Sequence, residues 1–243
     1  MEKNIKEYLP LLSKQWDVDT DALERMLDDL AQDSLFLSGI NAKIAGVQEF
    51  QGRSFSHPDD LRVYRILLYL VTRVFKPHVF VETGVQHGFG SAFILLAMHH
   101  NDRGELCSID VPPLGDERIT QQGTNPLPAG KSSGWVIPDG LRSRHRLVLA
   151  PAEQALPGVL AEYGAIDIFL HDSDHTYPHI MFEVGLAWKY LRPGGWIIID
   201  NIEQNDAFDH FVVGVKGNGF SLASFDGPER LWKHGLLRCV ERT

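Results

Sequence analysis

The chain has 243 residues, of which 44% are hydrophobic and 23% are charged, the composition of an ordinary globular protein. The formal net charge is −9 and the basic residues are scattered, which argues against a nucleic-acid partner. No apolar run approaches the roughly 18–20 residues of a membrane span, and the first ten residues lack a signal-peptide apolar region. Together with only two, widely separated cysteines, these features predict a cytoplasmic protein without a membrane partner.

The first 55 residues differ in character from the rest. Apolar residues at helical spacing predict helices over 5–12 and 22–30, whereas 39–52 shows no decided pattern. We therefore expect an N-terminal helical extension over 1–55 and a main domain over 56–243. The extension is interpreted as a lid, a packing layer or a dimer surface, and we expect a homodimer.

The main domain opens with a helix predicted over 61–75, for which residues 56–59 supply an N-cap and an early proline. From residue 78 onward, strands and helices alternate. Strands are predicted at 78–82, 105–109, 146–150, 166–170 and 196–199, and helices at 90–100, 153–162 and 179–191. This alternation predicts an α/β fold with a doubly wound, mostly parallel, Rossmann-like sheet.

Two segments depart from the alternation. Residues 220–225 and 236–240 predict an antiparallel strand pair at one end of the sheet. The segment 111–146 is long, irregular and rich in proline. Such connections are uncommon in compact domains, so we interpret it as an inserted loop that either covers a substrate or is a mobile surface loop, with Trp135 as its apolar anchor.

The sequence VFVETGVQHGFGS at residues 79–91 joins a predicted strand to a helix through three glycines, Gly84, Gly88 and Gly90. Such a turn gathers backbone N–H groups and a helix N-terminus at one place. Because glycine costs backbone entropy where it is not needed, three glycines favour a chain that passes close to a ligand. A tight turn that needs glycine for geometry alone is the alternative.

Ligands of open parallel sheets bind beyond the carboxyl ends of the strands, and polar residues follow each predicted strand here. Glu82 and the glycines stand at the end of the first strand, and Asp110 stands at the end of the second. An acid at this second position can accept hydrogen bonds from both hydroxyls of a ribose. This set suits an adenosine-type ligand.

Three oxygen-bearing side chains end the fourth and fifth strands: Asp172, Asp200 and Asn201. Carboxylate and amide oxygens on neighbouring strands form a hard ligand set that suits Mg²⁺. Capping of the following helix or loop is the alternative for each acid taken alone.

The runs VETGVQHGFGS, SID, IDIFLHDSDHTY and LRPGGWIIIDN, in this order and spacing, resemble the class I S-adenosylmethionine-dependent methyltransferases. Within that class, the chain is similar to the small metal-dependent O-methyltransferases of the catechol and caffeoyl-CoA type and to bacterial sugar and antibiotic O-methyltransferases. The resemblance covers roughly residues 60–243. It implies a seven-stranded fold, S-adenosylmethionine and a divalent cation as cofactors, and a small-molecule hydroxyl as acceptor.

The resemblance also implies roles for single residues. The implied cofactor-binding residues are Glu82, Gly84, Gly88, Asp110, Val111, Ala152, Glu153 and Asp172. The first three would line the methionine and ribose of the cofactor, Asp110 would hold the ribose hydroxyls, and the next three would contact adenine. Asp172, Asp200 and Asn201 match the metal ligands of the family.

The catalytic base is where the sequence departs from the family. His175 stands where those relatives carry a lysine, so we expect His175, beside Asp172, to accept the proton of the acceptor. Metal-free N- or O-methylation with His175 as base, and a catalytically silent cofactor-binding scaffold, remain alternatives.

Two other enzyme classes fit the sequence poorly. The glycine pattern differs from the G-x-G-x-x-G of nicotinamide dehydrogenases. His171, His175 and His179 are spaced four apart, as in a zinc-binding helix, but Pro178 interrupts them and no H-E-x-x-H occurs.

Overall fold

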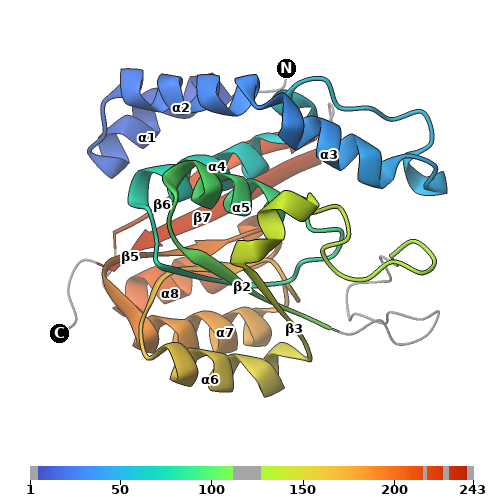
Figure 1. Cartoon of the computed structure of the whole chain (residues 1–243). Coiled ribbons are helices and arrows are strands. Elements are labelled where there is room, and N and C mark those ends of the chain that lie inside the picture. The colour runs from blue at the N-terminus through green and yellow to red at the C-terminus, as the bar shows by residue number, and fades with distance from the viewer. Residues whose placement is uncertain (1–4, 112–126, 216–217, 227–229, 240–243) are drawn as a thin grey trace.

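The computed structural model describes residues 5–111, 127–215, 218–226 and 230–239. A seven-stranded sheet runs through the molecule with helices on both faces (Figure 1). Its order is β3-β2-β1-β4-β5-β7-β6. The strands are β1 (Val79–Thr83), β2 (Glu105–Asp110), β3 (His145–Leu149), β4 (Ile166–His171), β5 (Leu191–Ile199), β6 (Asn218–Asp226) and β7 (Arg230–Arg238).

The first five strands are parallel, and β7 pairs antiparallel with both β5 and β6. The central strands are apolar and almost wholly buried because helices cover both faces. The predicted fold, a mostly parallel sheet with an antiparallel C-terminal pair, is confirmed.

The fifth strand begins earlier than predicted. Its pairing with β4 slips between Ile166 and Ile168, which align with Leu191 and Trp196, so the Pro193–Gly195 stretch forms an irregularity within β5. These first residues are not predicted as a strand because proline and glycine are typical of turns and bulges.

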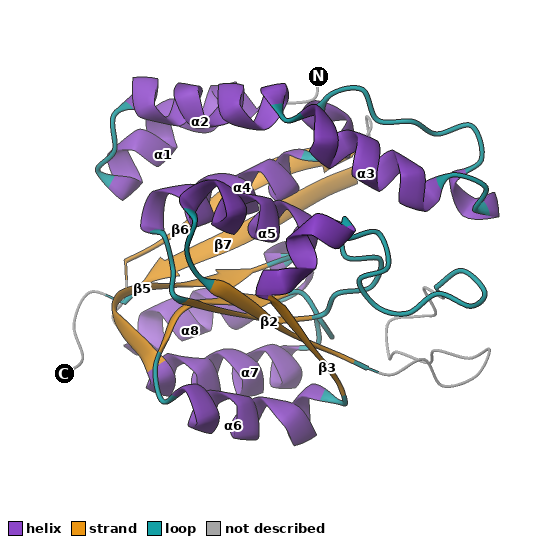
Figure 2. Ribbon diagram, viewed as in Figure 1, coloured by secondary structure: helices purple, strands orange, loops and turns teal. Residues whose placement is uncertain are grey.

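The helices form two layers. Helices α4 (Val63–Phe75) and α5 (Phe89–Asn101) cover one face of the sheet, and α6 (Ala152–Tyr163), α7 (Tyr177–Tyr190) and α8 (Ala207–Val215) cover the other (Figure 2). Short 3₁₀ turns lie at η2 (Gln48–Phe50), η3 (Pro58–Leu61), η4 (Asp139–Arg144) and η5 (Ile202–Gln204). The cap expected before α4 serves η3 instead, where the Asp60 carboxylate accepts from the His57 backbone N–H.

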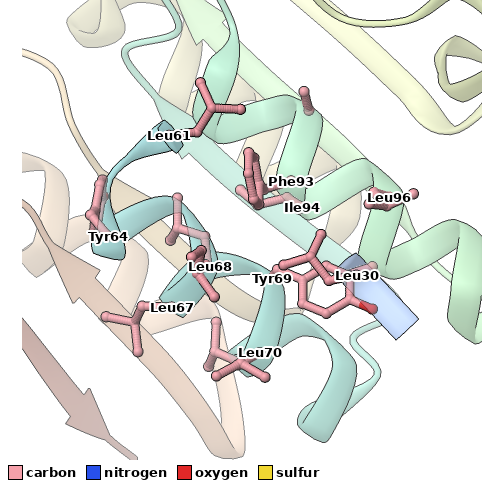
Figure 3. Close-up of a cluster of buried hydrophobic side chains, with 14 of the residues drawn as sticks. Leu30, Leu61, Tyr64, Leu67, Leu68, Tyr69, Leu70, Phe93, Ile94 and Leu96 are labelled. Carbon is pink, nitrogen blue, oxygen red and sulfur yellow. The ribbon is translucent and has the colours of Figure 1, made fainter. Parts of the chain in front are cut away.

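The N-terminal residues form an outer layer over α4 and α5 (Figure 1). It consists of η1 (Ile5–Tyr8), α1 (Leu9–Trp16), α2 (Thr20–Gln32) and α3 (Ser34–Ile44). Its buried side chains belong to the same hydrophobic cluster as α4, α5 and the sheet, and Leu30 lies among side chains of α4 and α5 in Figure 3. This layer therefore packs on the main domain, and its service as a lid or dimer surface stays a prediction.

Two helices lie where the sequence analysis predicted none. Asp33 caps α3 by accepting from the backbone N–H of Phe36 at 2.9 Å, and Asn205 accepts from that of Ala207 at the start of α8 at 3.0 Å. Both caps are the residue types expected before a helix. The helices themselves are short, and α3 contains Gly39, which weakens the helical signal.

Part of the predicted loop 111–146 is outside the described residues, namely 112–126. The remainder is fixed against the glycine-rich turn, since the N–H groups of Gly134 and Val136 donate to the carbonyls of Gln86 and His87. Trp135 is buried as expected, and its indole N–H donates to His87 Nδ1 at 2.9 Å. Whether this segment covers a substrate stays a prediction.

Within the described ranges, no helix combines the length and hydropathy needed to cross a membrane.

We expect the outer layer to contribute to the stability of the whole domain. Leu12→Ala removes a side chain with 0% exposure from the shared core and should lower the free energy of unfolding by about 2–5 kcal/mol. Leu35→Ala, at a position 81% exposed, is the matched control and should change it by less than about 0.5 kcal/mol. Urea unfolding measures both, and equal stabilities would contradict a shared core.

Candidate active site

The glycine-rich turn brings the ends of β1 and β4 into close contact. Gly84 has φ +84°, and a Cβ there would lie 1.9 Å from the Asp172 carbonyl oxygen. Gly88 has φ +91°, and a Cβ there would lie 2.6 Å from Gly134 Cα. Contacts within the chain therefore already require glycine at both positions. The turn also presents a helix N-terminus, since Gly88 is the N-cap residue of α5.

Glu82 lies beneath this turn, 1% exposed. Its carboxylate accepts hydrogen bonds from the hydroxyls of Ser91 and of Ser108, the latter at 2.6 Å. Burial raises the pKa of Glu82 to about 7, although the two serine hydrogen bonds oppose the shift. Glu82 is therefore a titratable group within the physiological range.

Asp110 ends β2 beside the turn and is 9% exposed. Its two carboxylate oxygens accept from the backbone N–H groups of Gln86 and Val111, at 3.1 and 3.0 Å. The Asp110 carbonyl accepts from Ala150, which brings the end of β3 alongside. The structure thus gathers Glu82, the turn and Asp110 at one edge of the sheet, as the sequence predicted.

The residues expected near adenine follow at the same edge. Val111 is 36% exposed, and Ala152 is buried at the start of α6. Glu153 is the next residue of α6, and its carboxylate lies 3.2 Å from Nδ1 of His179 on α7. The Glu153 side chain is therefore in contact with helix α7.

Two of the three predicted metal ligands, Asp172 and Asp200, lie together, and Asn201 follows Asp200 in the chain. Asp172 directly follows β4, and Asp200 and Asn201 directly follow β5. Backbone hydrogen bonds align the ends: Asp172 N–H donates to the Thr83 carbonyl, and Asp200 N–H donates to the His171 carbonyl. One ligand atom each of Asp172, Asp200 and His175 lies within 4.8 Å of the others.

The chemistry of this cluster suits a cation. Desolvation and then the charge of Asp200 raise the pKa of Asp172 well above its ordinary range. Burial acts to raise the pKa of Asp200 too, but His234, His175 and the hydrogen bond with Asp172 together outweigh burial, so the pKa is lowered. Asn201 Oδ1 is buried and has no hydrogen-bond partner among the described residues. Two crowded carboxylates and an unsatisfied oxygen are the features that a bound divalent cation would relieve.

His175 lies on the loop between β4 and α7, as predicted, rather than on a helix. It is 8% exposed, and its Nε2 lies 3.8 Å from Asp172 Oδ1. Burial, followed by the nearby His171, lowers the pKa of His175 to about 4, so its neutral form dominates near neutral pH. Asn205 holds the loop by donating to the His175 carbonyl at 2.8 Å.

A second, largely buried network lies behind this loop, centred on Glu183 of α7, which is itself fully buried. Its carboxylate contacts the hydroxyls of Thr83 and Ser173 and the imidazoles of His171 and His179. Burial acts to raise the pKa of Glu183, but the hydrogen bonds from the two histidines lower it to about 2. His171 and His179 therefore hold a carboxylate, which disfavours the zinc interpretation of the histidine spacing.

Two further residues of this region are not predicted from the sequence. His234 of β7 is 3% exposed, and its Nδ1 lies 2.5 Å from Asp200 Oδ1. Tyr64 of α4 stacks on the His234 ring, with ring centroids 4.1 Å apart. The Tyr64 hydroxyl is buried without a hydrogen-bond partner in the described part of the chain. Neither residue carries a signal in the sequence, because the contacts join distant parts of the chain and β7 begins at Arg230, well before the strand predicted at 236–240.

The fold and the arrangement of the strand ends are those of a class I methyltransferase. The sequence profile of a family described as "Methyltransferase domain" matches residues 81–202, just over half of the chain. The chain belongs to this methyltransferase family. No curated protein sequence matches it.

Solved structures share the fold at low sequence identity. The O-methyltransferase TomG from Streptomyces achromogenes, in complex with SAM, has 18% identity and a TM-score of 0.58, covering 87% of this chain and 92% of that one. An O-methyltransferase from Bacillus cereus in complex with SAH has 14% identity and a TM-score of 0.57, with coverages of 89% and 97%. An SAH-bound methyltransferase from Podospora anserina has 14% identity and a TM-score of 0.54, with coverages of 90% and 94%.

The raised pKa of Glu82 predicts a pH-dependent stability of the ligand-free protein. A folded-state pKa of about 7, above the ordinary 4.5, favours the protonated form, so its contribution is present at low pH and is lost as pH rises through 7. Glu82→Gln mimics the protonated form. The free energy of unfolding of the variant minus that of the wild type should therefore increase by roughly 2–3 kcal/mol from about pH 5 to about pH 8.

Urea unfolding of both proteins at the two pH values measures this gain. A wild-type-minus-variant difference that is the same at both would contradict the raised pKa.

Proposed function

We propose that the chain is an S-adenosylmethionine-dependent O-methyltransferase that acts on a hydroxyl of a small molecule with the help of a divalent cation. The observation that carries the proposal is the cluster of Asp172, His175 and Asp200, with Asn201 next in the chain, beside the glycine-rich turn in a methyltransferase fold. The solved relatives named as O-methyltransferases with bound SAM or SAH support the cofactor and the reaction.

We place the cofactor along the ends of β1, β2 and β3. The turn from Gly84 to Gly88 offers the helix N-terminus of α5, and Asp110 offers carboxylate oxygens for the ribose hydroxyls. Val111 and Ala152 provide apolar contacts for adenine at the same edge. Asp172 closes the cofactor site on the side of the acceptor, because its backbone lies against Gly84.

Asp172, Asp200 and Asn201 would hold the cation, and Mg²⁺ fits their oxygen atoms best. When bound, such an ion lowers the pKa of a hydroxyl that coordinates it. The protein residues position the acceptor oxygen in line with the methyl group, and positioning of this kind can supply roughly 7–11 kcal/mol.

In the transfer itself, the bond between the acceptor oxygen and the methyl carbon forms while the bond between sulfur and that carbon breaks. The sulfonium becomes a neutral thioether and leaves as S-adenosylhomocysteine. The acceptor proton goes to a ring nitrogen of His175, which is neutral and buried beside Asp172. No further co-reactant is needed.

His175→Ala tests the base. Turnover should fall by about 10²–10⁴-fold because the acceptor proton then has no side chain to receive it. The assay is a panel of phenols and sugar hydroxyls with S-adenosylmethionine, scored by product mass. His210→Ala, at an exposed histidine of α8, is the control and should retain turnover. A loss below about tenfold for His175→Ala would remove it from the mechanism.

Asp200→Asn tests the cation. Turnover at saturating Mg²⁺ should fall at least about tenfold, while the affinity for S-adenosylhomocysteine in calorimetry stays within about twofold. Asp206→Asn, at an exposed acid on the following loop, should change neither. Wild-type turnover that is insensitive to Mg²⁺ and to chelation would favour metal-free methylation with His175 as base, and failure to bind S-adenosylhomocysteine would leave only a scaffold.

A further inference from the structure

His234 is a buried polar residue at the site to which the proposed reaction assigns no step. It belongs to β7, whose Gly235 pairs with Ile199, so His234 lies beside the residue that follows β5. That residue is Asp200, and its Oδ1 lies 2.5 Å from His234 Nδ1. One carboxylate oxygen of a proposed metal ligand is therefore engaged by an imidazole.

The imidazole is itself fixed by Tyr64. The two rings are nearly parallel, with centroids 4.1 Å apart and an interplanar angle of 13°. Tyr64 is 7% exposed and lies in the first turn of α4, which packs in the main hydrophobic cluster. A rigid helix thus holds the ring that contacts Asp200.

This arrangement has a physical consequence for cation binding. If a carboxylate side chain has to become ordered when the ion binds, the entropy cost of that ordering lowers the affinity for the ion. A partner that engages one oxygen beforehand fixes the side chain and leaves the other oxygen for the ion. Such partners of metal ligands are typically worth about 10–100-fold in metal affinity.

We propose that His234 is a positioning residue that orients Asp200 for the divalent cation and that Tyr64 holds His234 in place by stacking. Helix α4 and the last strand thereby set the cation affinity of the site. This inference rests on the proposed cation site at Asp172, Asp200 and Asn201.

The test is calorimetric titration of the full-length chain with Mn²⁺, which reports binding without any acceptor. His234→Ala should weaken Mn²⁺ binding by about 10–100-fold. His234→Asn places an amide N–H₂ near the position of Nδ1 and should recover part of the affinity. Tyr64→Leu removes the stacked ring and should weaken binding in the same direction, whereas Tyr64→Phe keeps the ring and should stay within about twofold of the wild type.

His100→Ala is the matched control. His100 Nε2 lies 3.1 Å from Asp33 Oδ2 under the outer helical layer, so this variant also breaks a histidine–aspartate pair, but away from the proposed ligands. Its Mn²⁺ affinity should equal that of the wild type. If His234→Ala does not fold, His234→Asn and Tyr64→Leu decide, since each keeps a side chain in the cavity.

The possible failures are distinguishable. Equal Mn²⁺ affinity of the wild type and the His234 variants would overturn the positioning role and leave the cation site standing. A wild-type chain that binds no Mn²⁺ would remove the cation from the proposed function, and the positioning role with it, while methyl transfer by His175 could still be measured. Restored affinity in His234→Asn together with loss in Tyr64→Leu supports the proposal.

Discussion

The close contact between the ends of β1 and β4 is the constraint on which the site depends. The Asp172 carbonyl oxygen lies where a side chain at Gly84 would be, and Asp172 N–H donates to the Thr83 carbonyl. Because the two strands meet in this way, the glycine-rich turn after β1 and the loop after β4, which begins with Asp172, lie side by side. The Glu183 carboxylate reinforces this contact, because it accepts hydrogen bonds from the hydroxyls of Thr83 in β1 and of Ser173 in the loop. The proposed cofactor and cation sites are therefore parts of one rigid edge of the sheet.

Much of the fold could be predicted from the sequence because the strands are short apolar runs between turn residues. Buried parallel strands are mostly apolar, and polar residues gather at their carboxyl ends, so the strands and the polar residues at their ends can be predicted together. Asp110, Asp172 and Asp200 were found in this way. The start of β5 was not, because its proline and glycines have the local signature of a turn.

The partners of these residues could not be predicted, for a physical reason. His234 contacts Asp200, and Tyr64 contacts His234, only after the sheet and the helical layer have formed. A histidine in a strand and a tyrosine in an apolar helix are ordinary sequence features, and no spacing rule joins them. The glycine-rich turn itself is visible in the sequence. The contacts within the chain that require glycine at Gly84 and Gly88 are visible only in three dimensions.

The strand order has a consequence for how the molecule is completed during synthesis. The edge formed by β1, β2 and β3 is encoded before residue 150, whereas β7, which lies between β5 and β6, is synthesised only after all five parallel strands. A chain that stops before β7 would therefore have the strand ends proposed to bind the cofactor, while Asp200 would lack its contact with His234. The contact between His234 and Asp200 can form only once β7 has paired with β5, so this last pairing completes the surroundings of Asp200.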